Sequence, residues 1–132
     1  MHTSMRMATG ALVLGAMLVS TGVATAGRKE YRDVTVNVTE RKASGSLGDA
    51  RRNGTIQSIT ISIRGMANYM SGTAAFTDED GHRGHCFTTD PKMVEALASV
   101  RSDGLVSVEW TSNGECIVVD AYTSSRWSTK EQ

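Results

Sequence analysis

The strongest constraint in this sequence is a two-residue alternation of apolar and polar side chains that recurs along the chain. Three segments show it, with apolar residues at Val34, Val36 and Val38, at Ile59, Ile61 and Ile63, and at Val106, Val108 and Trp110. This period is typical of β-strands that bury one face. The chain is therefore predicted to be mainly β.

One helix is predicted after Asp90-Pro91. Asp90 is a favourable N-cap, and Pro91 suits the first helical position because its missing N–H would have no partner there. Apolar residues then recur at helical spacing, at Met93, Ala96, Leu97 and Val100. Gly104 is the expected stop, which predicts a helix of about three turns with one face packed on a sheet.

Three further strands are expected, over 73–77, 82–88 and 116–122. The last is apolar at nearly every position through Val119, so we expect it to be covered on both faces. Ile56 is out of phase with the isoleucines that follow it. A bulge near Gln57–Ser58 would restore the alternation and bend that strand.

The remaining segments are predicted to be turns and loops. The polar stretch 41–54 is expected to be a long connection with little core material, and 65–72 a loop. Residues 78–81 are expected to form a hairpin turn with Gly81 at positive φ. A calcium loop is the alternative for this turn, although the later EF-hand ligands are missing. Residues 112–114 form the last predicted turn.

Residues 1–26 have the pattern of a secretory signal peptide. Arg6 precedes an uncharged run from Met7 to Val19, and Ala24-Thr25-Ala26 is a small-residue cleavage site. An N-terminal membrane anchor is the alternative. Cleavage leaves residues 27–132, a length for one domain, with 13 basic and 14 acidic residues and no membrane span. The protein is expected to be secreted or periplasmic.

Cys86 and Cys116 are the only cysteines. In an exported protein two thiols most often pair, so we predict a disulfide between them. The alternative is a metal site that combines Cys86 with His82 and His85, but it offers too few ligands at recognisable spacings. We therefore expect no metal.

The order of elements predicts a particular fold class. It is mainly β with one helix: three strands, the helix and two strands, preceded by an additional N-terminal strand. This is the order of an OB-fold-like five-stranded Greek-key barrel. In that fold the third and fifth strands are parallel neighbours, which would allow the disulfide. An α+β meander with the helix on one face is the alternative.

Two function classes are disfavoured. Adjacent strand residues such as His85 and Cys86 point to opposite faces, and a bridged cysteine has no free thiol, so no catalytic pair and no cofactor site is apparent. Nucleic-acid binding needs a basic groove with aromatic platforms. The chain has 14 basic and 14 acidic residues, and Phe76, Phe87 and Trp110 alternate as core residues would. We therefore expect neither an enzyme nor a nucleic-acid-binding protein.

Residues 86–113 and 54–62 carry a family resemblance. The segments CFTTDPKMVEALASVRSDGLVSVEWTSN and GTIQSITIS resemble the B subunits of AB-type toxins of the pertussis and subtilase-cytotoxin kind. The resemblance covers about two thirds of the mature chain, residues 54–122. It implies a secreted OB-fold that assembles into a homo-oligomeric ring, binds cell-surface glycans and partners an A-like subunit.

The resemblance also implies a ligand-binding loop after the first barrel strand. The corresponding residues here are Arg64, Asn68, Tyr69 and Ser71. A tyrosine can lie on a sugar ring, an arginine can pair with a carboxylate, and Asn and Ser can bond hydroxyls. The leading hypothesis is therefore a non-enzymatic, glycan-binding module. The alternative is a periplasmic OB-fold domain that binds a protein or a small ligand, or is structural.

Overall fold

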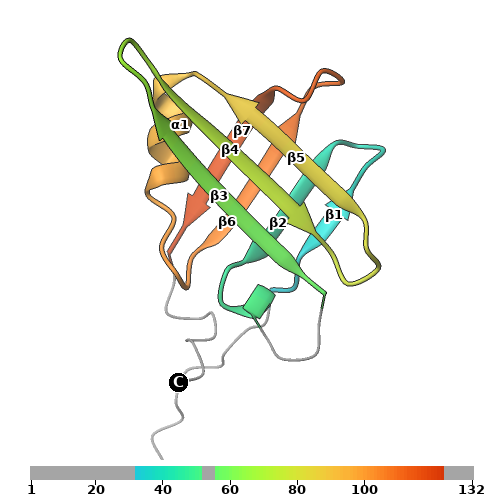
Figure 1. The fold of residues 1–132 in the computed structure, drawn as a ribbon. Coiled ribbons are helices and arrows are strands. Elements are labelled where there is room, and N and C mark those ends of the chain that lie inside the picture. The colour runs from blue at the N-terminus through green and yellow to red at the C-terminus, as the bar shows by residue number, and fades with distance from the viewer. Residues whose placement is uncertain (1–31, 52–55, 124–132) are drawn as a thin grey trace, which may run out of the picture.

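We describe the protein from a computed structural model, over residues 32–51 and 56–123. The predicted leader, residues 1–26, and its cleavage site lie outside the described residues. The described chain forms two antiparallel sheets and one helix, so the prediction of a mainly β protein with one helix is confirmed (Figure 1).

The larger sheet has four strands in the order β1-β2-β6-β7. Their bounds are β1 Thr35–Asn37, β2 Lys42–Ser46, β6 Leu105–Trp110 and β7 Cys116–Tyr122. The smaller sheet has three strands in the order β3-β4-β5, with bounds β3 Ser58–Gly65, β4 Met70–Thr77 and β5 Arg83–Thr88.

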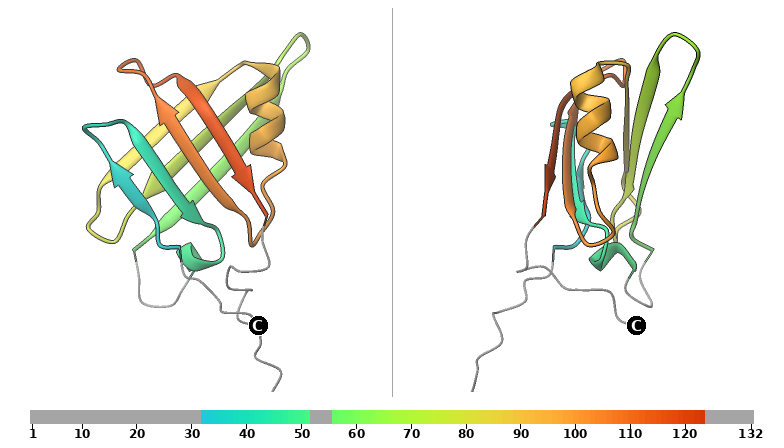
Figure 2. Two further views of the ribbon diagram at one scale, coloured as in Figure 1. Left: turned by 180° about the vertical axis from the view of Figure 1, so that it is seen from behind. Right: turned by 90° about the vertical axis from the view of Figure 1, so that its left-hand side faces the viewer.

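The two sheets stack face to face, and the helix α1 (Pro91–Ala98) lies at one side between them (Figure 2). The inner faces of the sheets, the helix and the residue before β1 together supply the buried core, which consists of Val34, Ala43, Ala74, Phe76, Cys86, Leu97, Val106, Val108 and Cys116. Glycine allows the closest approach across this core. A Cβ at Gly84 would lie 2.5 Å from the Trp110 ring, so the ring packs where no side chain is present.

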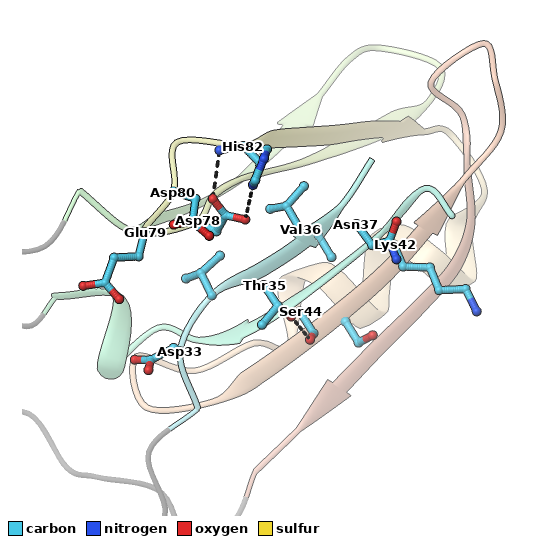
Figure 3. Close-up of a pocket in the computed structure, with 13 residues that line it drawn as sticks. Asp33, Thr35, Val36, Asn37, Lys42, Ser44, Asp78, Glu79, Asp80 and His82 are labelled. Carbon is cyan, nitrogen blue, oxygen red and sulfur yellow. Dashed lines mark hydrogen bonds and ion pairs between the residues drawn. The ribbon is translucent and has the colours of Figure 1, made fainter. Parts of the chain in front are cut away.

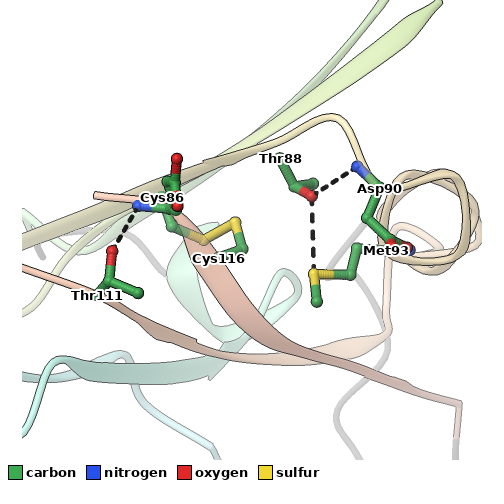
Figure 4. Close-up of a disulfide and its surroundings, with 7 residues drawn as sticks. Cys86, Thr88, Asp90, Met93, Thr111 and Cys116 are labelled. Carbon is green, nitrogen blue, oxygen red and sulfur yellow. Dashed lines mark hydrogen bonds between the residues drawn. A yellow bond between two sulfur atoms is a disulfide. The ribbon is translucent and has the colours of Figure 1, made fainter. Parts of the chain in front are cut away.

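The predicted disulfide is confirmed. Cys86 on β5 and Cys116 on β7 are bonded, their Cα atoms are 5.0 Å apart, and both residues are buried (Figure 4). Next to it, Phe87 and Glu115 form an isolated parallel bridge, and the Phe87 N–H donates to the Gly114 carbonyl over 2.9 Å. The disulfide therefore ties the smaller sheet to the larger one.

A second connection between the sheets closes the free edge of β1. The Val34 N–H donates to Oε1 of Gln57 over 2.7 Å, and Val36 gives a backbone hydrogen bond to Asp78. Gln57 immediately precedes β3 and Asp78 immediately follows β4, so both acceptors come from the smaller sheet. Exposed edge strands pair readily with other chains unless they are covered. Here two side chains cover the edge of β1.

The structure confirms Asp90 as the N-cap of α1 and Pro91 as its first residue. The Asp90 side chain accepts hydrogen bonds from the N–H groups of Lys92 and Met93, and Pro91 occupies the first turn. Thr88 Oγ1 accepts from the Asp90 N–H over 3.1 Å (Figure 4). The helix, however, ends at Ala98 rather than at Gly104, because Ser99 already acts as its C-cap. It is a turn shorter than predicted.

Three predictions were wrong, two about connections between elements and one about a bulge. The stretch 41–54 contains β2, which pairs with both β1 and β6, and a short 3-10 helix at Asp49–Arg51. Only 66–69 of the predicted 65–72 loop is a turn, because β4 already begins at Met70. No bulge interrupts β3, whose pairing with β4 is regular from Ser58 on; Ile56 precedes the strand and is exposed. The turns at 78–81 and 112–114 are present, with positive φ at Gly81 and Gly114.

The strands at the end of the chain also differ from expectation. β7 is an edge strand and is not covered on both faces, because Ile117 is 52% exposed. A register shift lies instead between Glu109 and Trp110, where β6 meets β7. The two sheets are not closed into a barrel, so the Greek-key barrel is not confirmed.

Removing the disulfide is predicted to destabilise the protein. The bond closes a loop across a separation of 30 residues, and a loop of that length corresponds to about 3.5 kcal/mol of unfolding free energy in the chain-entropy picture. We expect the Cys86→Ala/Cys116→Ala variant to unfold at a lower urea concentration than the oxidised protein. Wild-type protein reduced with dithiothreitol is the control and should match the variant. An unchanged urea midpoint would contradict the prediction.

Candidate functional site

The smaller sheet turns an open face to the outside, opposite the core. We call it the cationic face and define it by the residues that point away from the core on three strands: Ser58, Thr60, Ser62 and Arg64 on β3, Ser71, Thr73, Ala75 and Thr77 on β4, and Arg83, His85 and Phe87 on β5. Six of these eleven residues carry hydroxyl groups, and none is acidic. Strand alternation sets the composition, because the intervening positions form the core.

Neither arginine of the cationic face is neutralised by a neighbour among the described residues. Arg64 and Arg83 are exposed, and neither forms an ion pair with another described residue. Arg64 lies opposite Ser71, and Arg83 lies opposite Thr77. Because the Ser71–Thr77 segment of β4 separates these pairs, the two arginines stand roughly 20 Å apart along the strands. A guanidinium at each end suits an extended anionic ligand.

Two exposed aromatic side chains lie on or next to the cationic face. Phe87 is 46% exposed, so the prediction that it is a core residue was wrong, whereas Phe76 is buried as expected. Phe87 points outward because Cys86, its neighbour, occupies the inward position with the disulfide. Tyr69 is 50% exposed in the turn between β3 and β4.

The four ligand-binding residues suggested by the resemblance lie at the β3–β4 hairpin. Arg64 and Ser71 face each other across the two strands, and Asn68 and Tyr69 lie in the turn, where the Met66 N–H donates to the Tyr69 carbonyl over 2.8 Å. Asn68 is exposed, whereas Ser71 is buried. The sequence did not indicate Arg83, His85 or Phe87 as glycan-binding residues: it singled out His85 only as an alternative metal ligand or partner of Cys86, and Phe87 as a core residue. These three residues alternate with buried residues along 83–88, and that alternation could have identified them as one exposed face of the strand.

The larger sheet carries a different outer surface, on the opposite side of the molecule. Thr35, Ser44 and Ser107 lie side by side on β1, β2 and β6, and we call these three residues the hydroxyl row. Oγ1 of Thr35 and Oγ of Ser44 are 3.1 Å apart and share a hydrogen bond (Figure 3). Asp120 on β7 lies opposite Ser107, next to the end of the hydroxyl row. None of the four ligand-binding residues from the resemblance lines this surface.

Longer side chains stand on both sides of the hydroxyl row. On one side Nζ of Lys42 pairs with Oε1 of Glu109 over 3.3 Å. On the other side lie Leu105 and Tyr122, the latter 49% exposed. Short side chains between long ones leave a depression. Two hollows of about 550 and 570 Å³ open there, and both are lined by Asp33, Thr35, Ser44 and Ser107.

The turn after β4 forms the far wall of the first hollow. The Asp78 carboxylate is buried there; its Oδ1 accepts from the His82 N–H over 2.8 Å, and its Oδ2 lies 3.0 Å from Nδ1 of His82 (Figure 3). Burial alone would raise the pKa of the Asp78 carboxyl. The hydrogen bonds from His82 and Val36 and the electrostatic attraction of His82 outweigh burial, so this pKa lies below its ordinary value of 3.8.

The same turn brings together three groups that can bind metals. Ligand atoms of Asp78, Asp80 and His82 all lie within 4.8 Å of one another. Both oxygens of Asp78 already interact with His82, so these contacts explain the arrangement without a metal ion. The alternative metal site that combines Cys86 with His82 and His85 is excluded, because the disulfide occupies Cys86 and a bonded cysteine is not a thiolate ligand.

Comparisons with known proteins provide no further assignment. A scan against family models finds no matching family, and no curated protein or solved structure matches the chain. Within residues 32–51 and 56–123, no helix is long and apolar enough to cross a membrane.

Acid is predicted to weaken the Asp78 contacts. Because the folded-state pKa of Asp78 is lowered, its ionised form stabilises the fold above about pH 4, and that contribution is lost as the pH falls through the folded-state pKa. We expect Asp78→Asn to lower the free energy of unfolding by about 1–3 kcal/mol at pH 7 and to reduce its loss between pH 5 and 2.

Asp80→Asn is the matched control for this prediction. Asp80 is exposed and forms no hydrogen bond or ion pair with another described residue, so its variant should unfold as the wild type does. Urea unfolding at a series of pH values measures both variants. If Asp78→Asn showed the wild-type pH dependence, Asp78 would not be the group responsible.

Proposed function

We propose that this chain is a secreted or periplasmic, non-enzymatic module that binds an anionic glycan on the cationic face. The observation that carries the proposal is the pair of exposed arginines, Arg64 and Arg83, which form no ion pair with another described residue. They lie on a hydroxyl-rich face whose eleven defining residues include no acid. Carboxylate or sulfate groups of a glycan would pair with the guanidinium groups. Serine and threonine hydroxyls between them would bond the sugar hydroxyls.

The spacing of the two arginines favours a ligand longer than one sugar. Along β4 their positions are about 20 Å apart, and two strand spacings add about 10 Å sideways, so the diagonal is roughly 22 Å. A single carboxylate cannot reach both. An oligosaccharide with several acidic groups can, and Phe87 lies between the arginines where a sugar ring can pack on it.

The disulfide between Cys86 and Cys116 supports the proposed location outside the cytoplasm. A buried disulfide between two sheets is compatible with a compartment in which thiols oxidise. Anionic polysaccharides are abundant polymers outside the cytoplasm, so such a ligand would be accessible to an exported protein. The absence of a free thiol at Cys86 also removes the nucleophile of a Cys86–His85 pair, in line with a binding role.

The finer assignment to an OB-fold is part of the proposal. The order β3, β4, β5, α1, β6, β7 and the parallel bridge between Phe87 and Glu115 support an OB-fold-like relation for residues 58–122. The hairpin of β1 and β2 would then be the addition. A toxin B-like ring with an A-like partner subunit remains our proposal for the assembly, on the resemblance of residues 54–62 and 86–113.

A periplasmic domain that binds a protein or small ligand, or is structural, is the alternative. A glycan array with the purified, exported protein separates the two functions. We expect signals for sulfated or sialylated oligosaccharides and none for neutral ones. No signal above background for any acidic glycan would contradict the proposal.

The positions on the cationic face are tested with alanine variants. We expect Arg64→Ala and Arg83→Ala each to weaken binding about tenfold, which corresponds to ~1.4 kcal/mol, because each removes a charge-assisted contact. Tyr69→Ala tests the hairpin turn in the same assay. Affinities are measured by calorimetry with the best array ligand.

The chain provides matched controls for these variants. Arg101→Ala removes an exposed arginine that lies between α1 and β6, away from the cationic face. Tyr122→Ala removes a tyrosine about as exposed as Tyr69 but on the larger sheet. Both controls should bind as the wild type does. Equal affinities for Arg64→Ala, Arg83→Ala and Arg101→Ala would place the site elsewhere.

A further inference from the structure

The hydroxyl row on the larger sheet has no role in the proposed function. It lies on the outer face of β1, β2 and β6, whereas the cationic face belongs to β3, β4 and β5 (Figures 1 and 2). Only short side chains, those of Thr35, Ser44 and Ser107, occupy its floor. Oγ1 of Thr35 and Oγ of Ser44 share a hydrogen bond over 3.1 Å, and Ser107 lies one strand spacing, about 4.8 Å, from Ser44. The floor therefore presents a hydroxyl pair and a single hydroxyl as donors and acceptors to a sugar ring.

Both hollows share this floor but have different walls. The first is walled by the turn with Asp78, Glu79 and Asp80, and the second by Leu105 and Tyr122 (Figure 3). A ligand that lies along the row would meet polar groups at one end and the exposed Tyr122 ring at the other. An aromatic face at one end of a polar groove suits the apolar side of a sugar ring.

The charges of the first hollow select the kind of sugar. Glu79 and Asp80 are exposed and form no hydrogen bond or ion pair with another described residue. Lys42, which also lines this hollow, already pairs with Glu109. The uncompensated charge in the first hollow is therefore negative, and it attracts a cationic group. Arg32 lines the second hollow and not the first.

We propose that the hydroxyl row and the two hollows form a second binding site, for a short oligosaccharide that carries protonated amino groups. The ring hydroxyls bond Thr35, Ser44 and Ser107, one ammonium group lies near Glu79 and Asp80, and a terminal ring packs on Tyr122. The two sites have opposite charge, although the chain as a whole has 14 basic and 14 acidic residues. Each would bind a different class of sugar.

Two oligosaccharides that differ only in charge provide the probe. We expect calorimetry at pH 6 to show that a tetramer of glucosamine binds at least about tenfold more tightly than a tetramer of N-acetylglucosamine, which lacks the ammonium groups. The Glu79→Gln/Asp80→Asn variant should remove this difference while the acetylated tetramer binds as before. No binding of the glucosamine tetramer, or equal binding of the two tetramers to the wild type, would overturn the proposal.

Variants of the floor test the hydroxyl row itself. Ser107→Leu fills the depression and should reduce glucosamine-tetramer binding at least tenfold. Thr35→Val keeps the shape and removes one hydroxyl, so a smaller loss is expected. Thermal unfolding confirms that each variant folds. Wild-type affinity in both folded variants would overturn the assignment to the row.

The proposed second site and the proposed function can be refuted independently of each other. Arg64→Ala should leave the affinity for the glucosamine tetramer unchanged, and Ser107→Leu should leave the affinity for the acidic glycan unchanged. Loss of both ligands in one folded variant would show that the two surfaces are not separate sites. Loss confined to the variant of the matching surface supports two sites.

Discussion

The contact between the two sheets depends most on the bond between Cys86 and Cys116. Neither sheet alone can bury its inner face, and no hydrogen-bonded ladder between named strands joins them. The disulfide fixes β5 against β7, and the isolated bridge from Phe87 to Glu115 extends the contact by one residue. On another side, Gln57 and Asp78 bond the edge of β1. The core is enclosed between these two connections and α1.

The two outer faces follow from this arrangement. Once the inner positions of each strand are committed to the core, the alternate positions must face solvent. On β3, β4 and β5 these positions hold hydroxyls, Arg64 and Arg83, and on β1, β2 and β6 they hold the hydroxyl row beside an acidic turn. A chain with balanced charge thus presents two surfaces of opposite character. That separation is what allows two sugar classes to be proposed for one small domain.

Much of the local structure was predictable because it rests on short-range patterns. The strands around Ile61 and Val108, the glycine turns and the capped helix start at Asp90 all lie where the sequence placed them. β2 was missed because Ala43, Gly45 and Ser46 are small, and small residues give little hydrophobic contrast although all three are buried. The sequence indicated Arg64 and Ser71 through a resemblance, but Arg83 and Phe87 needed the pairing of β5 with β4.

The sequence by itself determined most of the elements, the pairing of its two cysteines and the alternation that divides each strand into an inner and an outer side. Only the tertiary structure decided how the strands are grouped into two sheets, which do not close into a barrel. It also decided that Thr35, Ser44 and Ser107 meet in one row, although more than 60 positions separate the last two. Local patterns fix the side on which a residue lies, whereas cross-strand neighbours depend on which strands pair.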